Sequence, residues 1–215
     1  MNTIRFDELD SYRDLHLILE SKTIAAPSPK TATTDIPGGD GVLDFTEYFG
    51  EVNYNNRKLT FEFSTIVPKK YFLELFSRVQ NKLHGKRMKI VLSDDPEFYY
   101  YGRVTINEWK SNKRIGKMTI EVDAEPYKYK QVMTVISDVL TSTKNIVCFN
   151  LNKAVVPKIT VEGRAVIKLG GYSVATEDES ITDDNIAFTQ GENVLTVSPE
   201  QGQVIITIEY QERGL

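Results

Sequence analysis

The feature that most constrains the fold of this chain is an alternation of apolar and polar side chains with a period of two residues. Leu59, Phe61 and Phe63 share one side of such a run, and a second run, with Leu15, Leu17 and Leu19, contains His16 and Glu20 between them. Successive side chains of a β-strand point to opposite faces, so this spacing predicts strands with one buried face. Further strands are predicted at 86–92, 98–106, 115–123, 146–150, 155–161, 193–197 and 204–210.

One segment has helical spacing instead, with apolar residues recurring at intervals of three and four. They are Phe72, Leu75, Phe76, Val79 and Leu83. Pro68 is suited to open this helix and Gly85 to end it. His84 is expected to be a surface residue at the negative end of the helix dipole rather than a catalytic group. The predicted fold class is therefore mainly β with one α-helix.

Two domains are predicted, residues 1–135 and 136–215. The alternating run 131–137 is followed by the polar stretch 141–145, and the short strands and Gly- and Asp-rich turns beyond it suit a small antiparallel β-sandwich. Up to Lys130 the chain has 20 basic and 19 acidic residues, whereas the remainder has 6 and 11. A basic stripe typical of duplex-binding proteins is missing, and the densest basic segment, 110–117, is predicted to be a solvated hairpin tip.

Residues suited to catalysis or to zinc binding are scarce. Two distant histidines and one cysteine cannot supply the usual zinc ligands, and neither histidine lies near a glycine-flanked serine. Cys148 lies in the apolar run 146–149, which predicts a buried, inert thiol. Carboxylate pairs such as Asp94 and Asp95, or the run 177–179, leave a glycosidase site open, but turn or loop charge is the favoured interpretation. We therefore expect no enzyme and no cofactor.

No membrane partner is expected either, because no run approaches the roughly 18 apolar residues of a membrane span and the N-terminus lacks the apolar core of a signal peptide. A soluble protein made in the cytoplasm is predicted.

The loop 36–41 is the strongest local signal. Its three glycines, Gly38, Gly39 and Gly41, indicate backbone turns that side chains would obstruct. A phosphate-binding loop would need Lys followed by Ser or Thr after the last glycine, and the sequence continues with Val42 instead. Asp40, Gly41 and Glu47 match the second half of a calcium loop, but the oxygen ligands of the first half are missing.

The aromatic run 98–101 suggests a stacking platform for sugars or bases. In a strand, however, Phe98 and Tyr100 face one side while Tyr99 and Tyr101 face the other. A role in the core and in a subunit interface is therefore favoured, because tyrosine is enriched in buried protein contacts.

Read in order, the first half of the chain resembles the N-terminal domain of siphophage distal tail proteins, often called Dit. The match lies in the arrangement of its elements. An opening hairpin carries a loop with Pro27 and Pro29, and the segment 36–44 leads through 54–57 into the strand 59–63. The helix, the turn 85–87 and the closing segment 124–129 follow in the family's order. The resemblance covers roughly Ile4 to Tyr129 and continues more weakly to the end.

The residues that carry this resemblance form two groups. The expected assembly loop contains Pro27, Pro29, Pro37, Gly38, Gly39, Gly41 and Asp44. The expected domain-closing motif contains Pro126, Tyr127 and Tyr129. We expect residues 25–41 to reach a neighbouring subunit or a tube component and to become ordered on assembly.

The resemblance implies a structural virion protein at the distal end of a non-contractile tail, made in the cytoplasm of the bacterial host. Six copies of a belt-like β domain would close into a ring whose channel lets DNA pass without sequence readout. A galectin-like β-sandwich would lie outside the ring. The implied partners are further copies of the chain, the major tail tube protein, the tail-associated tip protein and, as a further candidate, a receptor-binding protein.

Two other functions stay open on the sequence. The first is a carbohydrate-binding accessory module of the tail tip that contacts host cell-wall sugars through Tyr172 or Phe188. The second is a wall hydrolase, which the scarcity of histidine, cysteine and converging motifs makes least favoured.

Overall fold

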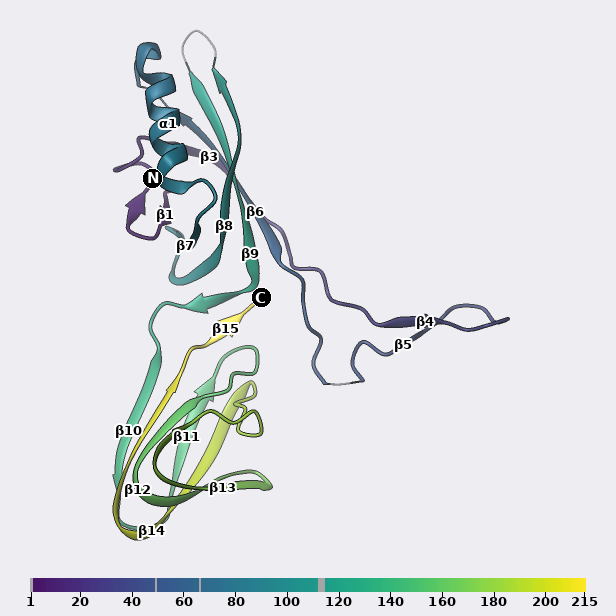
Figure 1. The fold of residues 1–215 in the computed structure, drawn as a ribbon, viewed down its shortest axis with the longest axis vertical. Coiled ribbons are helices and arrows are strands. Elements are labelled where there is room, and N and C mark those ends of the chain that lie inside the picture. Colours follow the sequence, from purple (N-terminus) through teal and green to yellow (C-terminus); the bar gives the residue numbers. More distant parts are fainter. Residues whose placement is uncertain (1, 49, 66, 112–114) are drawn as a thin grey trace. The chain divides into compact units, whose positions relative to one another are not determined.

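The computed structural model describes residues 2–48, 50–65, 67–111 and 115–215, which form antiparallel β-sheets and one α-helix (Figure 1). The mainly β fold class with one helix is thus confirmed for the described part of the chain. The chain divides into two units, residues 1–128 with Leu215, and Tyr129–Gly214. A boundary after residue 135 would instead cut β10 (Thr134–Leu140), every residue of which pairs with β14 (Gly191–Tyr210).

The first unit is built on a large antiparallel sheet with the strand order β2-β1-β7-β8-β9-β6-β3. Its strands are β1 (Ile4–Phe6), β2 (Leu9–Asp10), β3 (Ile18–Ile24), β6 (Arg57–Thr65), β7 (Arg87–Leu92), β8 (Asp95–Ser111) and β9 (Gly116–Lys130). A separate two-stranded ribbon is formed by β4 (Thr33–Asp35) and β5 (Val42–Asp44). The predicted alternation is present in β6, where Leu59, Phe61 and Phe63 are fully buried.

The helix forms where its spacing predicts. A 3₁₀ turn, η1 (Lys69–Tyr71), follows Pro68 and leads into α1 (Phe72–Leu83). The buried side of α1 consists of Phe72, Leu75, Val79 and Leu83. His84 ends the helix, and its Nδ1 accepts a hydrogen bond from the backbone N–H of Ile106 at 3.0 Å. This exposed residue thus joins the helix end to β8, which agrees with the predicted capping role.

The predicted strand around Leu15 and Leu17 is wrong in extent. Both side chains are fully buried, but they lie in a turn, and β3 begins only at Ile18. The backbone N–H of Leu17 donates to the carbonyl of Ser11, and His16 between the two leucines has a left-handed φ of 55°. A tight turn therefore places alternate side chains in the core without a strand.

The second unit contains a five-stranded antiparallel sheet with the order β10-β14-β12-β13, in which β11 also pairs with β14. The remaining strands of this sheet are β11 (Lys144–Asn150), β12 (Lys158–Leu169) and β13 (Tyr172–Ile181), and the short β15 (Arg213–Gly214) is not part of it. The strand β14 joins the two predicted strands 193–197 and 204–210 into one. Its first half pairs with β11 and its second half with β10. Left-handed glycines, Gly163 in β12 and Gly202 in β14, lie where the register between these strands shifts.

Three smaller predictions have different outcomes. The strand predicted at 155–161 begins at Lys158, and Val155 makes only an isolated bridge with Phe188. The run 177–179, predicted to be turn or loop charge, lies within β13. The basic segment 110–117 falls between the ends of β8 and β9, but residues 112–114 lie outside the described residues.

The aromatic run in β8 divides between two faces, as alternation predicts. Tyr100 is buried under the guanidinium of Arg57, 5.5 Å from its ring centroid. On the other face, Tyr101 lies under Arg87 at 4.8 Å. The two sides of β8 are therefore lined by different contacts, and no single aromatic platform forms from this run. None of the helices in the described residues is long and apolar enough to cross a membrane.

Candidate functional site: the projecting arm

Residues 25–56, here called the arm, leave the sheet of the first unit between β3 and β6 (Figure 1). Hydrogen bonds between the two sides of the arm close its base. The backbone N–H of Ala25 donates to the carbonyl of Lys58 at 3.0 Å, and Arg57 Nε donates to the carbonyl of Ala25 at 3.0 Å. Further out, Pro29 forms a bridge with Tyr54. The arm is thus a hairpin whose two sides are held together where it leaves the sheet.

The far end of the arm is the β4–β5 ribbon, whose register pairs Thr33 with Asp44 and Asp35 with Val42. The glycine loop connects the two strands. Gly38 and Gly41 have φ values of 73° and 79°, a region that side chains disfavour. The glycines therefore make the reversal of the chain, as predicted, and all residues of the loop are exposed.

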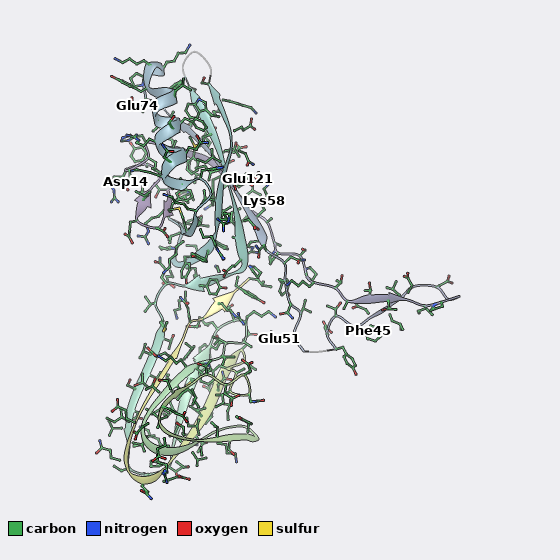
Figure 2. All side chains as sticks on the ribbon, in the orientation of Figure 1. Asp14, Phe45, Glu51, Lys58, Glu74 and Glu121 are labelled. Atoms are coloured by element: carbon green, nitrogen blue, oxygen red, sulfur yellow. The ribbon has the colours of Figure 1, made fainter. Side chains whose placement is uncertain are left out.

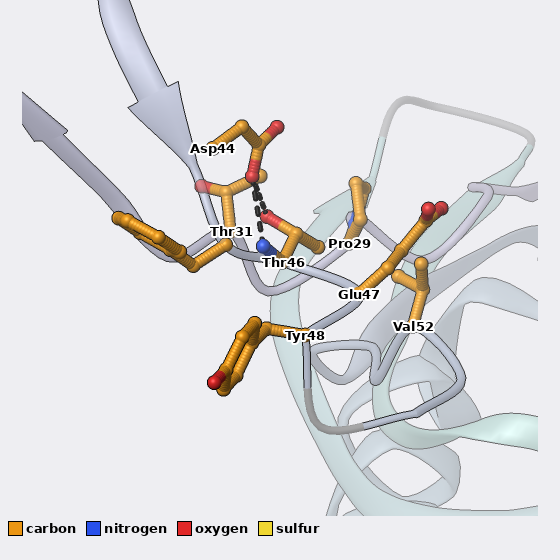
Figure 3. A pocket seen from close by; sticks show the side chains of 8 residues that line it. Pro29, Thr31, Asp44, Thr46, Glu47, Tyr48 and Val52 are labelled. Atoms are coloured by element: carbon orange, nitrogen blue, oxygen red, sulfur yellow. Dashed lines mark hydrogen bonds between the residues drawn. The ribbon is translucent and has the colours of Figure 1, made fainter.

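Behind this ribbon the arm has a shallow pocket of about 510 Å³ (Figure 3). The rings of Phe45 and Tyr48 meet edge-on beside it, with centroids 6.2 Å apart. Its lining consists of Pro29, Thr31, Asp44, Phe45, Thr46, Glu47, Tyr48 and Val52. Apolar rings and carboxylates thus lie side by side on one concave surface, which suits a partner with both apolar and basic groups.

Asp44 shapes this pocket from within. Its Oδ1 accepts hydrogen bonds from the backbone N–H of Thr46, at 2.9 Å, and from the Thr46 hydroxyl (Figure 3). These bonds hold the pKa of the Asp44 carboxyl below its ordinary value. The Thr46 hydroxyl in turn accepts from the backbone N–H of Ala32 at 3.1 Å. Asp44 therefore carries a negative charge at neutral pH and fixes the bend that follows β5.

The arm has no core of its own. Of its described residues none belongs to the buried apolar cluster of the first unit, although Pro27 at the base is buried. Its large apolar side chains are exposed instead, by 54% for Val42, 50% for Leu43 and 74% for Tyr48. Phe45 lies on the arm away from the sheet (Figure 2). Exposed apolar side chains grouped on one segment are typical of a surface that binds another molecule.

The residues of the predicted assembly loop all lie on the arm. Pro29 is at its paired base, the residues from Pro37 to Gly41 form its exposed end, and Asp44 turns the chain back. Pro126, Tyr127 and Tyr129 of the second motif lie in β9 and are half-buried. Tyr127 contacts Tyr54 edge-on, with ring centroids 6.2 Å apart, so the two motifs meet at the base of the arm.

The sequence prediction missed the exposed apolar residues of the arm. Val42, Leu43, Phe45 and Tyr48 follow the glycine loop directly, and no predicted strand was available to cover them. Four large apolar residues so close behind a glycine loop, with no predicted strand to bury them, were the available signal.

The other candidate residues do not converge on a site. No group of three or more His, Cys, Asp or Glu suited to hold a metal ion occurs in residues 2–48, 50–65, 67–111 and 115–215. Phe188, the proposed sugar contact, is fully buried against Tyr210, so its role as an exposed sugar-stacking ring is wrong. Tyr172 is half-buried and its hydroxyl donates to Asp183. Cys148 is buried, as predicted, and burial raises its pKa to about 11.

Comparison with known proteins gives one kind of match. No protein-family model and no curated protein sequence matches this chain. Among solved structures, the crystal structure of the SPP1 Dit (gp 19.1) protein is similar, with a TM-score of 0.72 and 16% sequence identity. That protein is described as a paradigm of the hub adsorption apparatus in phages that infect Gram-positive bacteria. The match covers 100% of both chains, and this chain therefore has a Dit-like fold from end to end.

Proposed function

We propose that this chain is a structural protein of a phage tail, without catalytic activity, that assembles into a ring at the distal end of a non-contractile tail. The observation that carries the proposal is the arm, which exposes Val42, Leu43 and Tyr48 and adds nothing to the core of its own unit. The Dit-like fold supports the same function, because the SPP1 protein with this fold belongs to a hub adsorption apparatus.

A ring of identical copies requires a head-to-tail interface, in which one surface of each copy meets a different surface of the next. The arm is suited to be one of these two surfaces. It is a long paired hairpin with a fixed base, formed by Ala25, Arg57 and Lys58, so it can extend without unfolding the sheet. Docking it on a neighbour would cover apolar side chains that a monomer leaves in water.

Six copies around a channel for DNA are the proposed arrangement. The major tail tube protein would adjoin this ring on one side and the tail-associated tip protein on the other, with a receptor-binding protein as a further candidate partner. The protein would be made in the cytoplasm of the bacterial host and act at the distal tip of the virion.

The second unit is proposed to be a galectin-like domain with a scaffold function. Its core is a single cluster that includes Ile146, Ile167, Phe188 and Ile206, enclosed by the bent strands β12 and β14. The burial of Phe188 removes one of the two aromatic side chains through which sugar binding was envisaged.

The proposal is tested by shortening the arm. Residues 31–52 are replaced with Asn-Gly, because Lys30 and Asn53 already lie across from each other, with the N–H of Lys30 donating to the Asn53 carbonyl at 2.8 Å. Asn-Gly is the preferred two-residue turn for such a hairpin. We expect the wild-type protein to form rings in negative-stain images and the shortened protein to stay a folded monomer by light scattering and circular dichroism.

The matched control carries Asn-Gly in place of Gly170-Gly171, a turn of the second unit in which an added Cβ meets no atom within 4 Å. This control should form rings like the wild type. A wild-type protein that stays monomeric at every concentration would overturn the proposed function. Rings that persist in the shortened protein would overturn the role of the arm.

A further inference from the structure

We propose that the arm of one copy docks on the groove beside η1 and α1 of the next copy, and that opposite charges select this position. The inference rests on the proposed ring and names its second surface. The groove has a volume of about 190 Å³ and is lined by Val67, Pro68, Tyr71, Glu74, Leu75 and Arg78. Here it is called the helix groove.

The net charge of each unit indicates which one of a neighbouring copy attracts the arm. The arm carries five acidic residues, Asp35, Asp40, Asp44, Glu47 and Glu51, against the single Lys30. The rest of the first unit, residues 1–24 and 57–128, has 18 Lys and Arg against 14 Asp and Glu, whereas residues 129–214 have 7 against 11. Complementary charge favours an interface and like charge opposes it. The acidic arm is therefore attracted to the first unit of a neighbour and repelled by the second unit.

Cations available for new ion pairs lie in and next to the helix groove: Arg78 lines it, and Lys69 and Lys70 stand between its lining residues Pro68 and Tyr71 in the chain. Among the described residues, Lys69, Lys70 and Arg78 form no ion pair, although Lys70 lies over the ring of Tyr71. All three are exposed, and Glu74 is the single acidic residue of the segment 67–83 (Figure 2). A carboxylate from another chain would thus meet cations that form no ion pair within the described part of their own chain.

A second basic surface, on β7 and β8, is less suitable because both of its arginines are already engaged. Arg87 forms an ion pair with Glu125 at 2.6 Å, and Arg103 donates to the carbonyl of Gly85 at 2.6 Å. Lys89 lies over the ring of Tyr99 at 4.8 Å, as Lys70 does over the ring of Tyr71, so this contact does not distinguish the two surfaces. New partners there would have to replace existing contacts, which lowers the net gain.

Apolar contacts at the two surfaces also match. The helix groove has an apolar floor, and Tyr71, one of its lining residues, is 46% exposed. The arm offers Phe45 and Tyr48 next to Glu47. An aromatic ring inserted in a shallow apolar pocket, with ion pairs at the rim, is a common arrangement at protein interfaces.

The arm is not placed to contact the helix groove of its own copy. In Figure 1, α1 and the arm lie on opposite sides of the long hairpin formed by β8 and β9, all within the first unit. Surfaces on opposite sides of a subunit are what head-to-tail assembly requires, because each copy must offer one to the neighbour before it and the other to the neighbour after it.

The test exchanges charges between the two surfaces. One variant has a basic arm, with Asp35→Lys, Asp40→Lys and Glu47→Lys, and leaves the internally bonded Asp44 intact. The other has an acidic groove, with Lys69→Glu, Lys70→Glu and Arg78→Glu. Lys69 and Lys70 lie just before α1, where acidic residues are compatible with the helix dipole, and Arg78 is an exposed residue in the middle of the helix, so the second variant should fold. Each variant alone should need a protein concentration roughly tenfold higher or more for half-assembly, because its own surfaces repel.

The equimolar mixture of the two variants should form rings again. In an alternating ring every basic arm meets an acidic groove and every acidic arm meets a basic groove. Native mass spectrometry should therefore find an even number of subunits, with both variants in equal number. A third variant, with Lys86→Glu, Lys89→Glu and Arg103→Glu, reverses the β7–β8 surface and should assemble like the wild type.

The outcomes distinguish this inference from the proposed function. Wild-type protein without rings contradicts the proposed function itself. If the wild type forms rings and the acidic-groove variant forms them equally well, only the docking position is contradicted. The same holds if the wild type forms rings and the β7–β8 variant does not. A mixture that fails to assemble, although both variants are folded and the wild type forms rings, contradicts it as well.

Discussion

The ring of Tyr54 meets the ring of Tyr127 edge-on, with 6.2 Å between their centroids and an interplanar angle of 81°. Tyr54 also forms the bridge to Pro29, so one residue joins both sides of the arm to β9. The arm itself has no apolar core, and this aromatic contact therefore adds to the hydrogen bonds that hold its base.

Tyr127→Ala should loosen the base of the arm. Edge-to-face aromatic pairs contribute about 1 kcal/mol beyond the area they bury, and the substitution removes one partner. We expect faster hydrogen exchange at the N–H of Asn55, which donates to the carbonyl of Ser28 at 2.9 Å. Tyr127→Phe keeps the ring and is the control. Unchanged exchange in Tyr127→Ala would show that the tyrosine pair does not hold the arm.

Gly102→Ala should separate β8 from β9. A Cβ at Gly102 would lie 2.4 Å from the carbonyl oxygen of Asp123 and 2.5 Å from the Cα of Ala124, and neither backbone atom can move without the strand. We expect a loss of about 3 kcal/mol or more in the free energy of unfolding, measured by urea denaturation. Gly171→Ala, where an added Cβ meets nothing within 4 Å, should stay close to the wild-type value. Similar stability of the two variants would contradict the close approach.

The sequence was sufficient to predict the fold class and the helix, because both depend on local spacing. Leu59, Phe61 and Phe63 are buried on one side of a strand, and α1 buries the positions that recur every three and four residues. Strand boundaries were less predictable. Two separate strands are predicted at 193–197 and 204–210, yet β14 continues through the intervening Gly202 because pairing with β12 resumes after the bend. Leu15 and Leu17 are buried from a turn, which produces the same pattern as a strand.

The candidate site was only partly predictable, for a physical reason. The glycines and prolines of the arm show where the backbone turns, but the sequence does not show that side chains such as Val42 and Leu43 stay exposed in the folded chain. The helix groove is even harder to predict from the sequence. Arg78 and Tyr71 are ordinary surface residues in the sequence, and their significance depends on the groove that Pro68 and Leu75 complete in three dimensions.

Phe188→Ala should destabilise the second unit, because Phe188 is a core residue and not a sugar contact. Phe188 is fully buried and meets Tyr210 edge-on, with centroids 5.2 Å apart. Large-to-small substitution at such a position costs about 3–5 kcal/mol, since it removes buried area and leaves a cavity. Thermal unfolding of the variant should show this loss, whereas Tyr172→Ala, at a half-buried position, should lose less. A Phe188→Ala protein as stable as the wild type would mean that the side chain is not part of this core.

The second unit should become less stable as pH rises, because Cys148 is buried in its core. Burial raises the pKa of this thiol from an ordinary value of 9.0 to about 11 in the folded protein. Between these values the unfolded chain has lost the thiol proton and the folded chain still binds it, so the free energy of unfolding falls as pH rises above 9. Burial also raises the pKa of Tyr210, to about 12, with the same sign at higher pH.

Cys148→Ala isolates the contribution of the thiol. Urea denaturation of both proteins at intervals from pH 8 to pH 10 should give a smaller loss of stability with pH for the variant, whatever its stability at pH 8. Tyr210 is present in both proteins, but a charged Cys148 also raises the pKa of Tyr210, so the comparison reports the thiol together with its effect on Tyr210. The intact thiol should also react slowly with a disulfide reagent at pH 8 while the protein is folded, and rapidly in urea, because the thiolate is the reactive form. Parallel pH profiles for the two proteins, or fast reaction of the folded thiol, would contradict the burial of Cys148 in the core of the second unit.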